Sequence, residues 1–470
     1  MALPLPKYVA FRDRDLKKYL QYLDHGPVSG SLQYSSDNMV SVYTKFELEP
    51  AKSGEINYVN IRCCYNNKYL ASSNDDKYLV TPFVDKPKED VKSWPCTLFK
   101  VGNYISSEGY YTLFDVWRQR LVCPCINSNN YDACLTTRYG SNEGNVQKIH
   151  QFIDFEALLV LPKRVAFKGD NGLYLAEYYY NDWEYMQFNC DDIGSSYVSH
   201  QVFTMADGSI RIKCEKSGMF WRRDPNWILA DSSDTTANDV NTLFWPVKVS
   251  KNTVALRSLA NNNFCKRLTA DDKEDCLNAA AETITKEATL EVVEPVISRE
   301  IYNVQYRTMN ARIYDEKVVS MATGDATNGG TEPTSMEIDL NYKKEKTKSW
   351  NSSLTMSLGI TTSVKAGVPG IGEAGIETTL SFSGTYEWGE TLSTSEEVGT
   401  TYTVNVPAQT RMKVTLLATM GTCDVPFSYT QRDVLRSGEQ VITNCDDGVY
   451  IGANCYNFKY ENKPLPLSSP

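Results

Sequence analysis

The sequence predicts an all-β protein, and three observations support this prediction. The composition favours strands, since the chain has 30 tyrosines and its valines, threonines and asparagines are spread over short alternating segments. Up to about residue 295, a unit of two short strands joined by a polar turn recurs. Beyond that point long Ser/Thr-rich alternating segments replace it. With 470 residues the chain is long enough for about three domains.

An internal duplication sets the first domain boundary. The segment Leu5–Arg12 reads LPKYVAFR, and the segment Leu161–Lys168 reads LPKRVAFK. Self-similarity of this kind indicates two domains built on one plan. The hairpin pattern stops after Glu294-Pro295, where a third domain begins. We therefore predict domains at residues 1–157, 158–295 and 296–470.

Each of the two copies contains three predicted hairpins. Each hairpin is an alternating strand, a turn of a few polar residues and a second strand that opens on an aromatic residue or leucine. Their first strands begin at Val9, Val59 and Tyr111 in the first copy and at Val165, Ile210 and Val254 in the second. Closing three half-apolar hairpins into a ring buries their apolar faces and removes exposed strand edges. The sequence thus predicts two tandem β-trefoils, and the alternative is an unrelated β-sandwich with chance alternation.

The third segment contains an amphipathic hairpin. In its first arm apolar side chains occupy every second position except Thr362, with small polar residues, glycine and lysine between them. After a Gly/Pro-rich turn predicted at Gly367–Gly375, apolar and aromatic residues of the second arm again share one parity. This pattern is typical of strands with one apolar and one polar face. The apolar positions are Leu354, Met356, Leu358, Ile360, Val364, Ala366 and Val368, followed by Ile376, Leu380, Phe382, Tyr386 and Trp388.

Hairpin arms of this length can cross a bilayer. Each predicted arm has about 13 residues or more, and a tilted strand of about 9–11 residues spans the hydrocarbon core. Because every backbone polar group must be paired in hydrocarbon, insertion requires a closed barrel built from several chains. The apolar faces would contact lipid and the Ser/Thr faces would line a water-filled lumen. The alternative is that both arms are ordinary strands of an elongated β domain.

Several motifs resemble those of the amaranthin-type plant lectins. In the first copy these are Asn67–Leu70 (NKYL) and Ser93–Lys100 (SWPCTLFK). In the second copy they include Val165–Leu175 (VAFKGDNGLYL) and Trp227–Leu229 (WIL). This resemblance covers about residues 1–295. The remaining segment, residues 296–470, resembles the aerolysin and epsilon-toxin pore module, chiefly through its Ser/Thr-rich hairpin.

The lectin resemblance implies a site for galactose- or N-acetylgalactosamine-type glycans between the subunits of a homodimer. Such sites combine aromatic stacking with hydrogen bonds from polar side chains. Leu79 stands where the family has a tryptophan, which leaves the glycan specificity open. The alternative for this loop is a solvated turn without a ligand. Carried onto this chain, the binding residues are Asn74, Asp76 and Tyr78, with Arg223 and Asp224 supplied by the second domain of another copy.

The two resemblances together imply a chimeric lectin of the plant-defence type. It would bind glycans, exist as a dimer in solution or as a ring-shaped pore, and insert a β-barrel into target membranes. Two alternatives remain open. One is a glycan-binding protein that forms no pore, and the other is a cytosolic scaffold for protein interactions.

Charge and the N-terminal segment bear on partners and location. The formal net charge of −10 and the isoelectric point near 5.1 oppose binding to a phosphate backbone, so no nucleic-acid partner is predicted. The first residues lack the basic region and the apolar stretch of a secretory signal. We therefore expect a cytoplasmic or nucleocytoplasmic soluble form and a membrane-inserted active form.

Neither an enzyme nor a metal or cofactor site is predicted. The three histidines, each isolated and outside any recognised nucleophile, zinc or general-base motif, are His25, His150 and His200. Cys123, Cys125 and Cys134 lack a fourth ligand at the usual zinc spacing. The thirteen cysteines show no disulfide-like spacing, so we expect most of them to be reduced and buried.

Overall fold

The computed structural model describes residues 2–105, 108–126, 128, 130–137 and 149–467, apart from the side chains of residues 379 and 380. Over these residues the protein is built from strands, with three short 3-10 turns at η2 (Val240–Thr242), η3 (Lys286–Ala288) and η4 (Thr308–Asn310). No helix in this part of the chain is long and apolar enough to cross a membrane. The predicted all-β fold class is confirmed.

Two compact units make up the protein. Unit 1 contains Met1–Ser298, Ser353–Leu358 and Asp433–Val441. Unit 2 contains Arg299–Ser352, Gly359–Arg432 and Ile442–Pro470. The segment Ser353–Leu358 therefore groups with unit 1, although the chain on either side of it belongs to unit 2.

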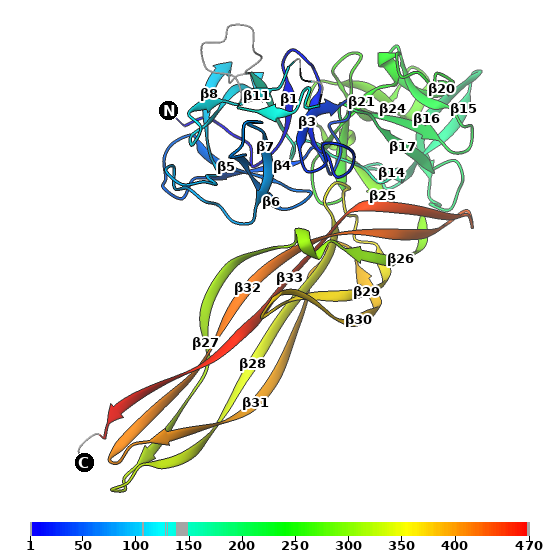
Figure 1. The fold of residues 1–470 in the computed structure, drawn as a ribbon. Coiled ribbons are helices and arrows are strands. Elements are labelled where there is room, and N and C mark those ends of the chain that lie inside the picture. The colour runs from blue at the N-terminus through cyan, green and yellow to red at the C-terminus, as the bar shows by residue number, and fades with distance from the viewer. Residues whose placement is uncertain (1, 106–107, 127, 129, 138–148, 468–470) are drawn as a thin grey trace. The chain divides into compact units, whose positions relative to one another are not determined.

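The first part of unit 1 holds the strands that carry the first copy of the repeat (Figure 1). Six of them pair antiparallel in a closed order, β1-β4-β5-β8-β9-β13 and back to β1, which we call the first ring. The strands are β1 (Tyr8–Asp13), β2 (Tyr19–Tyr22), β3 (Leu32–Ser36), β4 (Phe46–Pro50), β5 (Tyr58–Cys63), β6 (Lys68–Ser72), β7 (Val80–Val84), β8 (Leu98–Ile105), β9 (Tyr110–Asp115), β10 (Arg120–Leu121), β11 (Cys123–Pro124), β12 (Leu135–Thr136) and β13 (His150–Asp154).

The second part of unit 1 repeats this plan. Its strands are β14 (Arg164–Lys168), β15 (Tyr174–Tyr180), β16 (Trp183–Cys190), β17 (His200–Thr204), β18 (Ile210–Cys214), β19 (Phe220–Asp224), β20 (Trp227–Ser232), β21 (Phe244–Lys248), β22 (Thr253–Ser258), β23 (Phe264–Ala270), β24 (Lys273–Ala281) and β25 (Leu290–Val293). The second ring closes in the order β14-β17-β18-β21-β22-β25 and back to β14. Between its strands lie the hairpins β15–β16, β19–β20 and β23–β24. A closed six-stranded ring with three hairpins is the arrangement of a β-trefoil.

The six predicted hairpins start within one residue of the strands in the structure. In five of them the ring strand meets the hairpin strand at a pair made of one basic and one aromatic residue. The recurring pair explains why the repeat is visible in the sequence. The five pairs are Arg12 with Tyr19, Arg62 with Tyr69, Lys168 with Tyr174, Lys213 with Phe220, and Arg257 with Phe264.

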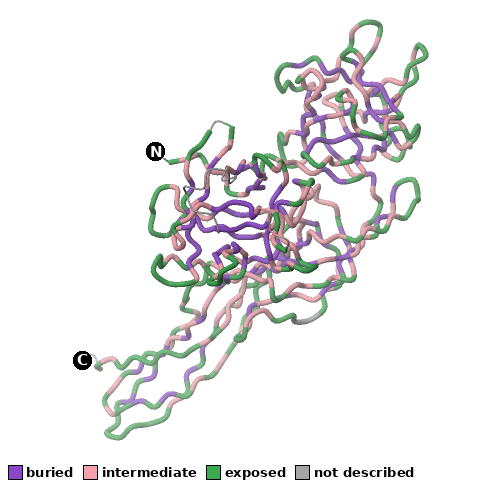
Figure 2. Tube along the Cα trace, turned by 45° about the horizontal axis from the view of Figure 1, so that its top comes forward, coloured by how far each residue is buried: buried purple, intermediate pink, exposed green. Residues whose placement is uncertain are grey.

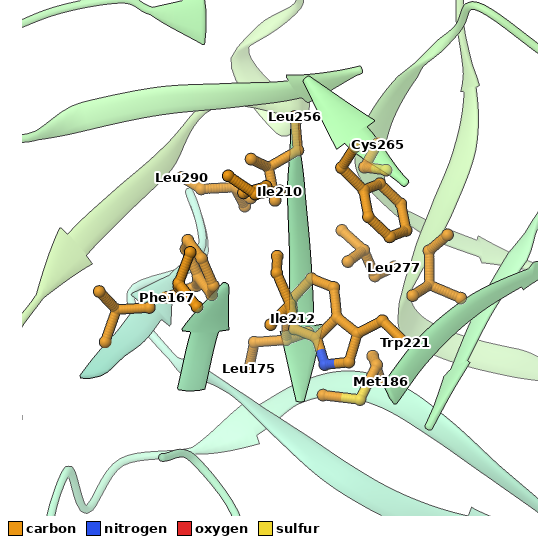
Figure 3. Close-up of a cluster of buried hydrophobic side chains, with 14 of the residues drawn as sticks. Phe167, Leu175, Met186, Ile210, Ile212, Trp221, Leu256, Cys265, Leu277 and Leu290 are labelled. Atoms are coloured by element: carbon orange, nitrogen blue, oxygen red, sulfur yellow. The ribbon is translucent and has the colours of Figure 1, made fainter. Parts of the chain in front are cut away.

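Each ring encloses its own apolar core. In the second ring Phe167, Leu175, Met186, Ile212 and Trp221 converge from different strands and are fully buried (Figure 3). In Figure 2 buried positions are concentrated inside the rings, and exposed positions lie along the loops. Burial of apolar surface stabilises such a core by about 25 cal/mol per Å² removed from water.

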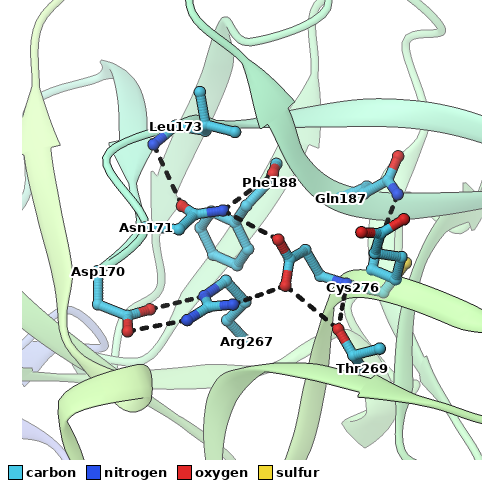
Figure 4. Close-up of polar contacts among 10 residues, drawn as sticks. Asp170, Asn171, Leu173, Gln187, Phe188, Arg267, Thr269 and Cys276 are labelled. Atoms are coloured by element: carbon cyan, nitrogen blue, oxygen red, sulfur yellow. Dashed lines mark hydrogen bonds and ion pairs between the residues drawn. The ribbon is translucent and has the colours of Figure 1, made fainter.

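A polar cluster ties a loop of the second ring to one of its hairpins (Figure 4). The Arg267 guanidinium on β23 donates two hydrogen bonds to Asp170, at 2.7 and 2.9 Å, and one to Asp275 at 2.6 Å. The bidentate contact with Arg267 lowers the pKa of Asp170 below its ordinary value. Asp170 lies two residues beyond the end of β14, so this contact anchors the loop that leads into β15.

Unit 2 consists of much longer strands (Figure 1). They are β26 (Val296–Tyr306), β27 (Arg312–Asn328), β28 (Thr334–Ser352), β29 (Thr361–Gly372), β30 (Gly375–Glu387), β31 (Leu392–Val406), β32 (Thr410–Leu435) and β33 (Gln440–Pro466). The sheet order is β30-β29-β26-β32-β33-β28-β31, with β27 paired to β32. β26 and β29 run parallel to each other. One apolar cluster, around Trp350, Phe427 and Tyr450, lies beneath β29 and β30.

The predicted amphipathic hairpin is β29–β30. Val364 and Ala366 on β29 and Tyr386 and Trp388 at the end of β30 are buried in the Trp350 cluster, with Val368, Ile376 and Phe382 packed against it. The alternate residues of β30 point outward, and Ser381, Ser383, Thr385 and Glu387 are exposed. The side chain of Leu380 lies outside the described residues.

The first arm of the hairpin was predicted to be a strand from Leu354 onward, and this is wrong for its first residues. Ser353–Leu358 is not a strand but an extended segment, here called the strap, that groups with unit 1. The main-chain N–H of Met356 donates to the carbonyl of Val160 at 2.8 Å. Leu354 packs near Phe155, and Met356 and Leu358 pack on the core of the second ring. Ile360 is half-buried and precedes β29. Alternating apolar residues suit any extended segment that packs one side, so the pattern alone did not identify a strand.

The predicted turn is also wrong. The chain does not turn over Gly367–Gly375, because β29 continues to Gly372 and only Glu373 and Ala374 separate it from β30. Gly367 is required by close packing, since a Cβ there would lie 2.4 Å from the Thr378 methyl group. A register shift between Gly367 and Val368 marks a β-bulge at this point. The glycines thus allow the two strands to approach and do not end them.

Candidate functional site

The loop predicted to bind a glycan joins β6 to β7 at the surface of the first ring. Asn74, Asp75, Asp76 and Lys77 are all exposed. The Asp75 carboxylate accepts a hydrogen bond from the Ser73 hydroxyl at 2.6 Å and one from the main-chain N–H of Lys77 at 3.1 Å. The Ser73 hydroxyl bond, above all, lowers the pKa of Asp75. Asp75 therefore shapes the turn, and Asn74 and Asp76 are left facing solvent.

Tyr78 is held in a fixed position at the end of this loop. Its φ of 56° lies in the left-handed region, which a tyrosine seldom adopts without support. The support comes from β12, where the Thr136 hydroxyl and the Thr137 N–H each donate to the Tyr78 carbonyl at 2.9 Å. The guanidinium groups of Arg118 and Arg120 lie 4.8 and 5.3 Å from the centre of the Tyr78 ring. Such cation–π contacts restrain the ring further.

A buried carboxylate organises the base of the loop. Asp115 accepts hydrogen bonds from the Ser72 hydroxyl and, at 2.8 Å, from the main-chain N–H of Arg118. Burial raises the pKa of Asp115, and these two donors oppose that rise. Arg118 in turn donates from its guanidinium to the carbonyls of Ser73 and Asp75. Arg118 and Arg120 thus belong to the site, although the sequence analysis did not identify them.

An exposed aromatic pair borders the same loop. The Trp94 indole N–H donates to the Ser72 carbonyl at 3.0 Å, and the ring stacks on Phe83 with 5.9 Å between centres. Trp94 is 46% exposed. Leu79, by contrast, is buried and forms a β-bridge with Thr136. The flat aromatic surface that Leu79 does not provide is therefore supplied near the loop by Trp94.

The second group of predicted binding residues, Arg223 and Asp224, lies at the end of β19, next to the turn that leads to β20. The Asp224 carboxylate accepts a hydrogen bond from Arg222 at 2.9 Å, and Arg222 also makes a bidentate contact with Asp231. The contact with Asp231, chiefly, raises the pKa of Arg222. Arg223 donates to the Pro225 carbonyl and to the side chains of Asn226 and Asn241. Both Arg223 and Asp224 are half-buried.

The two groups do not meet within one chain. Among the described residues no hydrogen bond, ion pair or ring contact links the loop Asn74–Leu79 to Arg223 or Asp224. The sequence analysis expects the two groups to meet in a site formed with a second copy of the protein. That expectation stays a prediction.

The histidines and cysteines have structural environments. His150 and His200 are buried in the rings, and His25 is exposed beside Asp24. All thirteen cysteines are free, and most are buried. Burial raises the pKa of the Cys134 thiol to about 11. No cluster of three or more metal-binding side chains occurs within the residues that the structure describes.

The family comparison places this protein in the lectin class. The profile of the Agglutinin domain matches residues 3–112 and 159–294, and the chain belongs to the Agglutinin-domain family. The matched families are not enzyme families.

Curated relatives and solved structures are similar to parts of this chain. Natterin-1 of Thalassophryne nattereri is 26% identical over 171 residues, which are 36% of this chain and 48% of natterin-1. The chain thus spans about half the length of the curated relatives it matches. Among solved structures, a lamprey immune protein has a TM-score of 0.31 and 14% identity, covering 66% of this chain and 93% of that one. An aerolysin-like protein of Bombina maxima has a TM-score of 0.24 and 14% identity, covering 36% and 99%.

Proposed function

We propose that this protein is a lectin that binds galactose- or N-acetylgalactosamine-type glycans and, after oligomerisation, forms a β-barrel pore with the hairpin β29–β30. The burial pattern of this hairpin supports the pore. Val364, Ala366 and Tyr386 face an apolar cluster, and Ser381 and Ser383 face solvent. The arms of 12 and 13 residues exceed the about 9–11 residues that cross a bilayer core as a tilted strand.

The loop supports glycan binding by its chemistry. Asn74 and Asp76 offer an amide and a carboxylate to sugar hydroxyl groups. Tyr78 and Trp94 are restrained aromatic rings beside these groups, and rigid polar and aromatic groups are typical of sugar sites. Arg223 and Asp224 of a second copy would complete the site. The fixed geometry of Tyr78 limits the entropy lost when a ligand binds.

Glycan binding is tested on an array and by calorimetry with galactose and N-acetylgalactosamine, using mannose as the unrelated sugar. We expect Tyr78→Ala and Asp76→Asn to weaken binding about tenfold or more. Tyr104→Ala is the control, because Tyr104 is an exposed tyrosine of the first ring that also lies beside an arginine, Arg14. Unchanged binding by the Tyr78→Ala variant would show that the sugar site is elsewhere.

Pore formation is tested by dye release from vesicles that carry a galactose-terminated glycolipid. The variant Glu300→Cys/Ser363→Cys places a disulfide between β26 and β29, whose Cα atoms are partners at this position. We expect the oxidised double variant to release no dye and the reduced form to release it. The two single cysteine variants are the controls, since they contain the same native cysteines.

The two assays also separate the alternatives. Glycan binding without dye release by the wild type would identify a lectin that does not form pores. If the wild type shows neither glycan binding nor dye release, a scaffold for protein interactions would be favoured. We further propose a cytoplasmic or nucleocytoplasmic soluble form, which cell fractionation in the native source would test.

A further inference from the structure

The hairpin β15–β16 of the second ring carries a concentration of aromatic side chains. Its strands pair Tyr178 with Tyr185 and Tyr180 with Trp183. Residues directly opposite each other in an antiparallel pair share one face, so these four rings lie on the same side of the hairpin. The turn consists of Asn181 and Asp182, whose φ values of 49° and 63° are typical of a tight two-residue hairpin turn.

These rings form a continuous surface with a neighbouring hairpin. Tyr178 and Tyr180 are stacked at 6.4 Å with only 14° between their planes. Tyr180 is 6.4 Å from Tyr185, and Tyr185 is 6.4 Å from Trp227 on β20. We call Tyr178, Tyr180, Trp183, Tyr185 and Trp227 the aromatic face.

The outer part of the aromatic face is exposed to water. Trp183 is 48% exposed and Tyr178 is 40% exposed, whereas Trp227 is buried at the inner end. Clusters of exposed rings are unfavourable in water, and where they persist they usually mark a binding surface. The stability of the ring core does not require them, because the core of the second ring is formed by other residues.

The three-fold repeat shows that the fold does not require aromatic residues here. The hairpins of the second ring open at equivalent aromatic residues, Tyr174, Phe220 and Phe264. The residues four positions later are Tyr178, Asp224 and Leu268. Tyr178 is therefore particular to the first of these hairpins, and closing the ring does not account for it.

We propose that the aromatic face is a second carbohydrate-binding surface that takes an uncharged hexose or a short chain of them. A pyranose ring has an apolar C–H face that stacks on Tyr and Trp rings, and its hydroxyl groups need hydrogen-bond partners at the edge. The Lys273 ammonium group lies 5.4 Å from the Tyr185 ring centre and 5.1 Å from that of Trp227, and can donate to such hydroxyls. This surface is separate from the loop Asn74–Leu79 and does not depend on it.

The surrounding charges favour a neutral sugar over a lipid surface. Asp182 forms the turn and accepts a hydrogen bond from the Tyr179 hydroxyl at 3.0 Å. Glu177 and Glu184 lie on the opposite face of the same hairpin. These three carboxyl groups make this end of the hairpin acidic, which disfavours an approach to anionic headgroups.

The test uses the full chain with Tyr78→Ala, so that the loop site is inactive, and an array of neutral galactose, glucose and mannose oligosaccharides. We expect binding of at least one of these glycans to persist, and to fall about tenfold or more with Trp183→Ala or Tyr178→Ala. Tyr179→Ala is the control, since Tyr179 is 64% exposed on the opposite face and its loss should change nothing. Trp183→Phe should keep part of the binding that Trp183→Ala loses. If Trp183→Phe binds in this way, loss of folding does not explain the weaker binding of Trp183→Ala.

Three outcomes would overturn the proposal. The first is that the Tyr78→Ala chain binds none of these glycans, and the second is that Trp183→Ala leaves their binding unchanged. The third is Trp183-dependent binding to sugar-free phosphatidylcholine or phosphatidylserine vesicles with no glycan binding. None of these outcomes decides on the loop site, which is judged by the change in galactose binding between the wild type and the Tyr78→Ala variant.

Discussion

His200 shows how burial alone sets the chemistry of a residue in this protein. It lies on β17, its Nε2 is 3.2 Å from the Leu175 carbonyl, and its ring packs on Phe167 and Trp221 at 6.0 and 5.1 Å. Burial lowers the pKa of His200 to about 4. His150 in the first ring is buried as well, and burial lowers its pKa too. Both imidazoles are therefore neutral in the folded protein at physiological pH.

We predict that the second ring loses stability as the pH falls from about 6.5 to about 4. In this window the unfolded chain protonates His200 and the folded chain does not, so protons favour unfolding. The full effect of a shift of this size is about 3 kcal/mol. Urea unfolding followed by tryptophan fluorescence at several pH values measures it.

The prediction is checked with a variant that lacks this histidine, by comparing how steeply the free energy of unfolding depends on pH. His200→Asn should flatten the dependence of the free energy of unfolding on pH, whatever its effect at pH 7. An unchanged slope in the His200→Asn variant would contradict the prediction.

The candidate loop shows which site residues a single sequence can reveal. Asn74, Asp76 and Tyr78 could be named because they are contiguous and match a family motif. Arg118 and Arg120 could not, because they lie about 40 residues further on and reach Tyr78 only through the ring closure. The fixed backbone of Tyr78 was equally hidden, since its φ depends on donors from β12.

At the scale of elements, hairpins were predictable and extended segments were not. The ring hairpins combine alternation, a polar turn and a basic-aromatic pair, so several local signals agree. The strap has only alternation, which a packed extended segment satisfies as well as a strand does. Gly359, with a φ of 70°, separates the strap from β29. A glycine on its own does not show whether it is needed for a left-handed backbone conformation, as at Gly359, or only for close packing, as at Gly367.

We predict that Met356→Asp detaches the strap from unit 1. A carboxylate cannot replace the thioether that packs on the second ring, and we expect a loss of about 1–2 kcal/mol of docking free energy. Limited proteolysis should then cut within residues 353–360 faster than in the wild type. Thr361→Asp is the control, because Thr361 is exposed at the start of β29. Equal cleavage rates in the two variants would mean that the strap is not held by this contact.

At the scale of the whole molecule, the duplication has a consequence for assembly. The first ring carries the exposed loop, and the second ring carries Arg223 and Asp224, so each copy holds both halves of the predicted site. In a two-fold symmetric dimer such halves pair reciprocally and create two equal sites. The Agglutinin family was predictable from sequence because its motifs are local. The sharing of a site between chains was expected only from the lectin resemblance, and because the structure holds a single chain, it stays a prediction.

This sharing can be tested by mixing two inactive variants. Tyr78→Ala lacks the loop half of the site and Arg223→Ala lacks the other half, so neither should bind galactose-type glycans alone. If the halves come from different chains, a mixed dimer contains one intact site and one doubly altered site. Equal amounts of the two variants, unfolded and refolded together, should then recover about a quarter of the wild-type sites by calorimetry. If both halves come from one chain, no mixture can recover binding, and the dimeric site would have to be abandoned.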